Sequence, residues 1–110
     1  MKRPSPFACD MSALSSEQRA RHNALGESLR STLTAVCELA DGFEFEFPLV
    51  PATFNSLMEL TLLEHACCPF FDISVVLKQD NKLVWQLTGR EGIKEFIRME
   101  FGLWIEAGPH

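Results

Sequence analysis

The fold of this chain is constrained most by an alternation of phenylalanine and glutamate that begins directly after an Asp-Gly pair. Residues 43–47 read FEFEF, and Asp41 and Gly42 precede them. Successive side chains of a strand point to opposite faces, so the three phenylalanines share one face and the two glutamates share the other. An Asp-Gly pair between two strand-like segments is a strong hairpin signal, and residues 35–39 supply the other strand. The sequence therefore predicts an antiparallel hairpin with one apolar face and one solvated face.

The remaining patterns predict three helices and a second hairpin. Ser15 or Ser16 can cap a first helix, whose apolar residues recur at helical spacing. A second helix, roughly residues 52–68, is apolar on most sides and follows Pro51, which suits a first helical turn. A closing amphipathic helix comes after Thr88 and Gly89. The apolar positions of the first helix are Leu25, Leu29 and Leu33, those of the last are Ile93, Phe96, Ile97 and Phe101, and the second hairpin pairs residues 72–77 with 83–87.

The resulting order α-β-β-α-β-β-α predicts an α+β fold in two layers. Two hairpins joined by a helix favour a four-stranded antiparallel sheet with the helices on one face. The 110 residues, 46% of them hydrophobic and 23% charged, suffice for one domain with its own core. We expect residues 1–13, which carry two prolines, to form an extended N-terminal arm, and residues 14–110 to form a single α+β domain.

Charge and hydropathy argue against several classes of partner. The formal net charge is −5, whereas binding to nucleic acid usually rests on concentrated lysine and arginine. Glu59 and Glu64 interrupt the longest apolar run, so we expect no membrane span. Residues 1–3 resemble the start of a signal peptide, but residues 4–6 read PSP where an apolar stretch would be required. No glycine-rich phosphate loop is present, so no nucleotide cofactor is expected. We expect a soluble cytoplasmic protein with reduced thiols.

Residues 64–71, which read EHACCPFF, are the part of the chain that most resembles a functional site. On a helix, Glu64, Cys67 and Cys68 share one side of a single turn because they are three and four residues apart. Pro69 disfavours helical geometry at Cys68, which places both thiols at the helix end. A Cys67–Cys68 bridge is disfavoured, since adjacent Cα atoms lie about 3.8 Å apart and relaxed disulfides need about 4.4 Å or more. In a reducing compartment, such a cluster points to metal binding or redox chemistry.

The electrostatics of this position favour a metal ligand over a catalytic thiol. A helix C-terminus presents partial negative charge and Glu64 adds a full one, so both disfavour the thiolate. A bound cation reverses that balance, because it deprotonates coordinating thiols and is attracted by the same negative charges. Buried structural cysteines remain an alternative interpretation of Cys67 and Cys68. A tetrahedral site also needs ligands from elsewhere in the chain.

Two distant residues are candidates to complete the site. His22 lies three residues before Leu25, so it projects toward the core side of the first helix, where it is either hydrogen-bonded, a ligand or a general base. Cys9, in the arm, can fold back over the thiols to complete a three-sulfur site, or can simply anchor the arm. Arg19 and Arg21 are either surface residues of the first helix, which is the usual case, or one of them pairs with the Glu64 carboxylate. Two further side chains are expected outside the site: Cys37 in the core, and His65 on the far side of its helix.

Five segments also carry a family resemblance: residues 7–10, 19–22, 41–43, 64–71 and 87–96. Together they resemble a group of small bacterial proteins marked by a Glu-x-x-Cys-Cys-Pro-Phe segment and a Thr-Gly-Pro-Glu-Gly-like turn. Some members resemble companions of heavy-metal-responsive regulators, which implies soft metals such as mercury or zinc. The resemblance implies no mechanism. It implies the candidate positions Cys9, His22, Glu64, Cys67 and Cys68, whereas Arg90 departs from the proline that is usual in the turn.

Three functional hypotheses follow from these patterns. The leading one is binding of a soft or borderline metal ion, such as zinc, copper(I) or mercury, through Cys67 and Cys68, with Cys9, His22 and Glu64 completing or supporting the site. Such a protein would sequester, sense or deliver the ion. The second is a thiol-dependent enzyme or redox protein. The third is an interaction module with structural cysteines, in which the apolar residues 101–105 extend beyond the last helix and form a homodimer contact.

Overall fold

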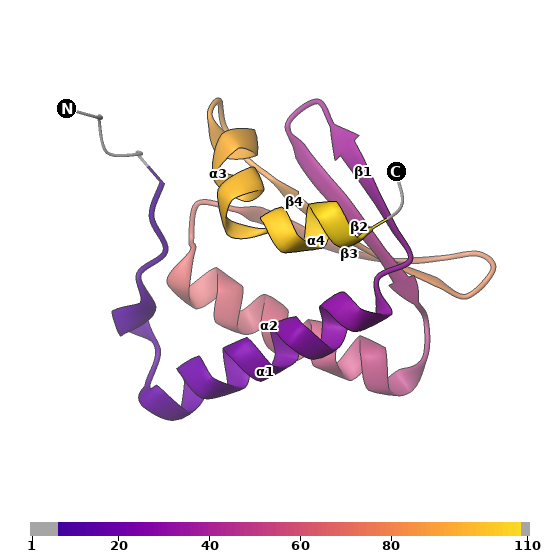
Figure 1. The fold of residues 1–110 in the computed structure, drawn as a ribbon, viewed down its shortest axis with the longest axis horizontal. Coiled ribbons are helices and arrows are strands. Elements are labelled where there is room, and N and C mark those ends of the chain that lie inside the picture. The colour runs from indigo at the N-terminus through magenta and orange to yellow at the C-terminus, as the bar shows by residue number, and fades with distance from the viewer. Residues whose placement is uncertain (1–6, 109–110) are drawn as a thin grey trace.

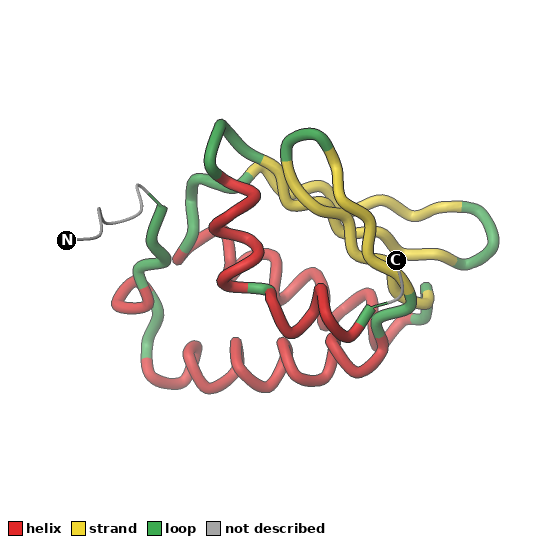
Figure 2. Tube along the Cα trace, turned by 45° about the horizontal axis from the view of Figure 1, so that its top comes forward, coloured by secondary structure: helices red, strands yellow, loops and turns green. Residues whose placement is uncertain are grey.

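The computed structural model describes residues 7–108 of the chain, and it has the predicted α+β architecture. A four-stranded antiparallel sheet with the strand order β1-β2-β4-β3 forms one layer, and the helices form the other (Figure 1). Figure 2 shows the strands gathered on one side of the molecule and the helices on the other. The elements are η1 (Met11–Ala13), α1 (Ser16–Thr32), β1 (Ala35–Leu39), β2 (Gly42–Pro48), α2 (Pro51–Cys67), β3 (Asp72–Lys78), β4 (Lys82–Thr88), α3 (Ile93–Glu100) and α4 (Gly102–Ala107).

The alternating FEFEF segment occupies the centre of the sheet as strand β2. Phe43, Phe45 and Phe47 are at most 2% exposed, whereas Glu44 and Glu46 on the opposite face are partly exposed. The neighbouring β4 places Trp85 directly opposite Phe45. The indole Nε1 of Trp85 donates a hydrogen bond of 3.0 Å to Thr61 Oγ1 of α2, which ties this helix to the sheet. The predicted hairpins and the apolar face of the sheet are thus confirmed.

The boundaries of the first two long helices follow local signals in the sequence. Ser15 accepts a hydrogen bond from the backbone N–H of Gln18, while the Gln18 side chain accepts from the backbone of Ser15, which completes a capping box. Helix α2 begins at Pro51 and ends at Cys67, so Cys68 is its C-cap and Pro69 follows. The two thiols therefore lie at the end of α2, as predicted.

The C-terminal segment differs from its prediction. Residues 102–107 form a further helix, α4, that folds back onto the sheet instead of extending away from it. Trp104 is 7% exposed and its ring lies 5.5 Å from that of Phe45 in an edge-to-face arrangement. Burial within the same chain thus accounts for the two aromatic residues of this segment, Phe101 and Trp104, whereas Leu103 remains exposed. Their apolar character therefore no longer argues for a dimer contact.

The described part of the arm, residues 7–13, packs against the domain. Phe7 and Leu14, on either side of Cys9, are 2% and 3% exposed. Residues 11–13 form the short helix η1, capped by the Asp10 side chain. Residues 1–6 lie outside the described part, so the structure gives no test of the arm there. Among residues 7–108, no helix combines the length and the apolar character needed to cross a bilayer.

Candidate functional site

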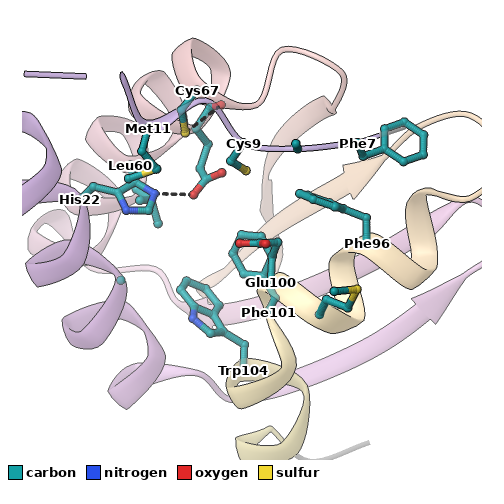
Figure 3. A pocket seen from close by; sticks show the side chains of 14 residues that line it. Phe7, Cys9, Met11, His22, Leu60, Cys67, Phe96, Glu100, Phe101 and Trp104 are labelled. Carbon is teal, nitrogen blue, oxygen red and sulfur yellow. Dashed lines mark hydrogen bonds and ion pairs between the residues drawn. The ribbon is translucent and has the colours of Figure 1, made fainter. Parts of the chain in front are cut away.

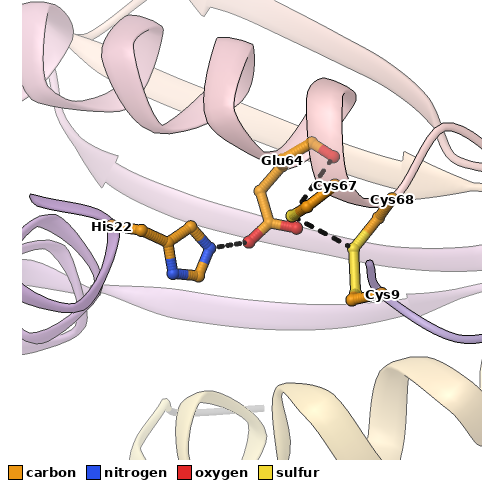
Figure 4. The surroundings of a disulfide bond; sticks show 5 residues. All are labelled: Cys9, His22, Glu64, Cys67 and Cys68. Carbon is orange, nitrogen blue, oxygen red and sulfur yellow. Dashed lines mark hydrogen bonds and ion pairs between the residues drawn. A yellow bond between two sulfur atoms is a disulfide. The ribbon is translucent and has the colours of Figure 1, made fainter. Parts of the chain in front are cut away.

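Four potential metal ligands converge at the C-terminal end of α2. One ligand atom from each of Cys9, Glu64, Cys67 and Cys68 lies within 4.8 Å of the others. We call these four residues the donor cluster (Figure 4). Three of its members come from the last turn and the cap of α2, and the fourth comes from the arm. The structure therefore places Cys9 over the two adjacent thiols, where the sequence predicted it could fold.

Backbone contacts hold the arm in this position. The N–H of Asp10 donates a hydrogen bond of 2.8 Å to the carbonyl oxygen of Cys67, one of the carbonyls that a helix end leaves without an intrahelical partner. The N–H of Cys68 donates to the carbonyl of Glu64 at 2.7 Å, which closes the last turn of α2. Because Phe7 and Leu14 are buried on either side, Cys9 is drawn toward the cap of α2.

Cys9 and Cys68 form a disulfide, with their Cα atoms 4.7 Å apart. Cys67 remains a free thiol, and its Sγ lies 3.6 Å from the Sγ of Cys68. The expectation of fully reduced thiols is therefore wrong for two of the four cysteines. It rested on the assumed compartment, whereas the bridge follows from a fold that joins positions 59 residues apart. The predicted lack of a Cys67–Cys68 bridge is confirmed.

The Glu64 carboxylate is buried and pairs with His22. Glu64 is 4% exposed, and its Oε1 accepts a hydrogen bond of 2.6 Å from Nε2 of His22 on α1. The alternative in which Arg19 or Arg21 pairs with Glu64 is therefore wrong, and the surface position expected of Arg21 is confirmed. Arg21 instead forms an exposed ion pair with Glu59, and Arg19 donates to the carbonyl oxygen of Leu14. The core side of α1 carries His22, whereas Arg21 lies about a hundred degrees away around the helix, toward solvent.

The ion pair shifts the titration of His22. The hydrogen bond that the imidazole donates to the carboxylate of Glu64 raises the pKa of His22, although partial burial of the imidazole opposes that rise. The other ring nitrogen, Nδ1, is buried and has no hydrogen-bond partner among the described residues. His22 therefore holds one oxygen of Glu64 from the side opposite the cysteines, as Figure 4 shows. It positions the carboxylate and does not itself belong to the donor cluster.

Burial makes Cys67 a weak nucleophile. It raises the pKa of the Cys67 thiol to about 11, and the negative charge of Glu64 adds to this effect. Cys67 is 1% exposed, so water cannot stabilise a thiolate there. This agrees with the electrostatic argument from the sequence, and it counts against Cys67 as an activated nucleophile at neutral pH.

Two other candidate side chains lie outside the site. The prediction that Cys37 is a core residue is wrong, because its side chain is exposed. In the edge strand β1, Val36 points into the core, so its neighbour Cys37 points to the opposite face. His65 is exposed on α2, away from the donor cluster, as its position one residue after Glu64 predicted.

A cavity of about 410 Å³ adjoins the donor cluster. Cys9, Cys67 and His22 line one side of it (Figure 3), and Glu64 also belongs to the lining. Sequence reasoning missed the opposite wall, because that wall comes from α3 and α4 and forms only when the C-terminus folds back. We call this space the aromatic cavity, after the rings of Phe7, Phe96, Phe101 and Trp104 that line it.

The reactivity of the two free thiols should differ sharply. Iodoacetamide added to the native, non-reduced protein at about pH 8 should modify Cys37 and leave Cys67 unmodified, because burial shields the Cys67 thiol and raises its pKa to about 11. Peptide mapping by mass spectrometry measures both. Unfolding in urea before alkylation is the control, and it should make Cys67 reactive. Modification of native Cys67 as fast as Cys37 would contradict the described burial.

The buried ion pair should matter more to stability than the exposed one. We expect His22→Ala to lower the free energy of unfolding by about 2–3 kcal/mol, because it leaves a buried carboxylate without its partner. Arg21→Ala, which removes one partner of the exposed pair on the same helix, is the matched control and should cost about 0–1 kcal/mol. Urea denaturation at neutral pH measures both. Equal losses in the two variants would contradict this assignment.

The pH dependence tests the raised pKa of His22. The charged imidazole contributes stability that is fully present below the unfolded pKa of about 6.5 and is lost as the pH rises through the higher folded value. His22→Gln keeps a donor for Glu64 but does not titrate. The stability of the wild type relative to His22→Gln should therefore be greater near pH 6 than near pH 9. A relative stability that rises with pH would have the wrong sign.

No family model, no curated protein and no solved structure matches the chain. The family resemblance of the motif segments therefore stays a prediction.

Proposed function

We propose that the donor cluster, once the Cys9–Cys68 disulfide is reduced, binds one soft or borderline metal ion. The thiolates of Cys9, Cys67 and Cys68 would be its ligands, and Glu64 would supply a fourth donor. The observation that carries this proposal is that all four donor atoms lie within 4.8 Å of one another. Thiolate-rich sites select zinc, copper(I) or similarly thiophilic ions over magnesium and calcium.

The spacing of the sulfur atoms fits a tetrahedral site. Zinc–sulfur bonds of about 2.3 Å place two sulfur ligands of a tetrahedron about 3.8 Å apart. The Sγ atoms of Cys67 and Cys68 are already 3.6 Å apart. Only the bridged pair, Cys9 and Cys68, must separate when their bond breaks. Little rearrangement of α2 is therefore needed to hold an ion.

Loading of the site requires a reductant that opens the Cys9–Cys68 disulfide. A dithiol supplies two electrons and two protons, the Cys9–Cys68 bond breaks to give two thiols, and the dithiol becomes its own disulfide. The ion then displaces one proton from each cysteine that it binds. The disulfide form keeps only one of the three thiols, so it would bind the ion weakly. The proposed setting is a reducing compartment such as the cytoplasm.

The charges around the cluster support a cation. Glu64 is buried beside Cys67. The burial of Cys67 and the negative charge of Glu64 both oppose a free thiolate at Cys67. A metal ion would replace the proton of Cys67 and offset the negative charge of Glu64 at the same time. Since Nε2 of His22 holds Oε1 of Glu64 at 2.6 Å, the other carboxylate oxygen is left to face the sulfur atoms.

One observation favours a second candidate, thiol–disulfide exchange. The free Cys67 lies next to a disulfide, so its thiolate could attack the sulfur of Cys9 and release Cys68 as a thiolate, which avoids the disfavoured Cys67–Cys68 bridge. The raised pKa of Cys67 weighs against this reaction at neutral pH. Burial of Phe101 and Trp104 within the chain likewise removes the main support for an interaction module formed by residues 101–105. Metal binding therefore remains the leading proposal.

Metal binding can be tested on the reduced protein under anaerobic conditions. The chain is reduced with a phosphine, freed of metal, and titrated with Zn²⁺ and Hg²⁺ while charge-transfer absorbance and bound metal are measured. We expect one Zn²⁺ per chain for the wild type, whereas the exposed Cys37 thiol can bind Hg²⁺ in addition. The double variant Cys67→Ser, Cys68→Ser should lose affinity by at least about 100-fold, since two ligands are removed.

The chain offers a matched control in Cys37→Ser. This substitution also removes a free thiol, but an exposed one outside the cluster, so it should bind metal as the wild type does. The non-reduced wild type should bind far more weakly than the reduced form. Equal metal content in the wild type and the double variant would contradict the proposal.

A further inference from the structure

We propose that the natural ligand of this site is a thiophilic metal or metalloid centre that carries one apolar organic group of about the size of an aryl ring. This inference rests on the proposed function, because the donor cluster would hold the thiophilic centre. The aromatic cavity beside it would hold the organic group. The inference thus specifies an organic group on the ligand, whereas the proposed function requires only a metal ion.

The cavity and the donors form one continuous space. Cys9, Glu64 and Cys67 belong to the donor cluster and also line the cavity of about 410 Å³. A bare ion bonded to four donors would fill none of this space. A centre with one organic substituent would instead direct that substituent away from the sulfur atoms, toward the opposite wall (Figure 3).

The opposite wall is built for an apolar group. Phe96, Phe101 and Trp104 are each at most 7% exposed, and Leu60 of α2 and Phe7 of the arm extend the apolar lining. An apolar cavity of about 150 Å³ is enough to hold benzene, so this one has room for an aryl ring. Ring-on-ring contacts with such walls favour an aromatic guest over a methyl group.

A glycine in the middle of α1 leaves open space at the cavity wall. Gly26 lines the cavity one turn after His22, and a Cβ added there would meet nothing within 4 Å. Glycine inside a helix is less favourable than alanine, because it loses more backbone freedom on folding. Packing does not explain this cost, because no neighbour needs the space. An unfilled position at the cavity wall is what a ligand of this size would require.

The charge of the cavity fits a cationic guest. Glu64 lies beside the sulfur atoms, and the exposed Glu100 lines the cavity on the side of α3. An aryl-metal cation carries its charge on the metal and its apolar surface on the ring. The metal would therefore lie at the donor cluster, and the ring would lie against the aromatic wall of the cavity. Its binding forms one metal–sulfur bond for each thiol proton released and breaks no bond between metal and carbon.

The test compares Hg²⁺, methylmercury and phenylmercury on the reduced protein, with Cys37→Ser in every variant because the exposed Cys37 thiol would bind these probes by itself. The two organic cations have the same charge and bind sulfur alike, so their affinity ratio isolates the cavity. Competition with glutathione sets the reference ratio for a thiol in water. We expect the protein to prefer phenylmercury over methylmercury by at least about tenfold relative to glutathione, which corresponds to about 1.4 kcal/mol.

Filling the cavity should remove this preference. Gly26→Leu places a side chain at the cavity wall without removing a ligand, and it should return the affinity ratio of phenylmercury to methylmercury to that of glutathione. Ala24→Leu, at an exposed position of the same helix, is the matched control and should keep the preference. Circular dichroism checks that both variants fold.

The outcomes separate this inference from the proposed function. Binding of Hg²⁺ and methylmercury without a preference for phenylmercury in the wild type would overturn the inference and leave metal binding intact. A preference that survives in Gly26→Leu would also overturn it, because the cavity would then not be its source. Failure of all three probes to bind would overturn both proposals. The wild-type ratio alone decides the question if Gly26→Leu does not fold.

Discussion

The junction between the arm and the end of α2 is the contact on which the site depends. The Cys9–Cys68 disulfide and the hydrogen bond from Asp10 to the Cys67 carbonyl attach the arm at this point. Without the arm, the donor cluster would lose Cys9, and the aromatic cavity would lose Phe7 from its wall. Local geometry at one helix end thus decides both the ligand set and the shape of the space beside it.

A second constraint is the buried charge of Glu64. The Glu64 side chain is only 4% exposed, so its carboxylate needs a partner. The imidazole of His22 on α1, 42 residues earlier in the sequence, is that partner. This pairing fixes α1 against α2 near the donor cluster. It also keeps negative charge beside Cys67, which opposes a reactive thiolate and attracts a cation. The same side chains therefore stabilise the packing of the helices and bias the chemistry of the site.

The fold was predictable from sequence because its signals are local. The alternation in β2, the capping serine of α1 and the proline after Cys68 each act within a few residues, and each has the expected effect. Helix α4 was missed because it depends on a reversal at Phe101 and on burial of Trp104 against Phe45, which are tertiary contacts. Periodicity within residues 101–107 gave no signal for that reversal.

The site was predictable in its members but not in their pairing. Spacing placed Glu64, Cys67 and Cys68 on one side of a helix turn, and His22 on the core side of α1. It did not determine which residue neutralises Glu64 or that Cys9 bonds to Cys68, since both depend on how distant segments cross. The aromatic cavity depends most on contacts between distant segments, because its walls come from the arm, α1, α2, α3 and α4. Only the assembled fold reveals it.

X-ray absorption at the zinc edge tests the central claim most directly. The reduced protein carrying one Zn²⁺ per chain should show three sulfur atoms at about 2.3 Å and one lighter atom at about 2.0–2.2 Å. The Cys37→Ser variant should give the same spectrum, because Cys37 lies outside the donor cluster. A zinc ion surrounded only by nitrogen and oxygen atoms would contradict the account, since the cysteines would then play no part in binding.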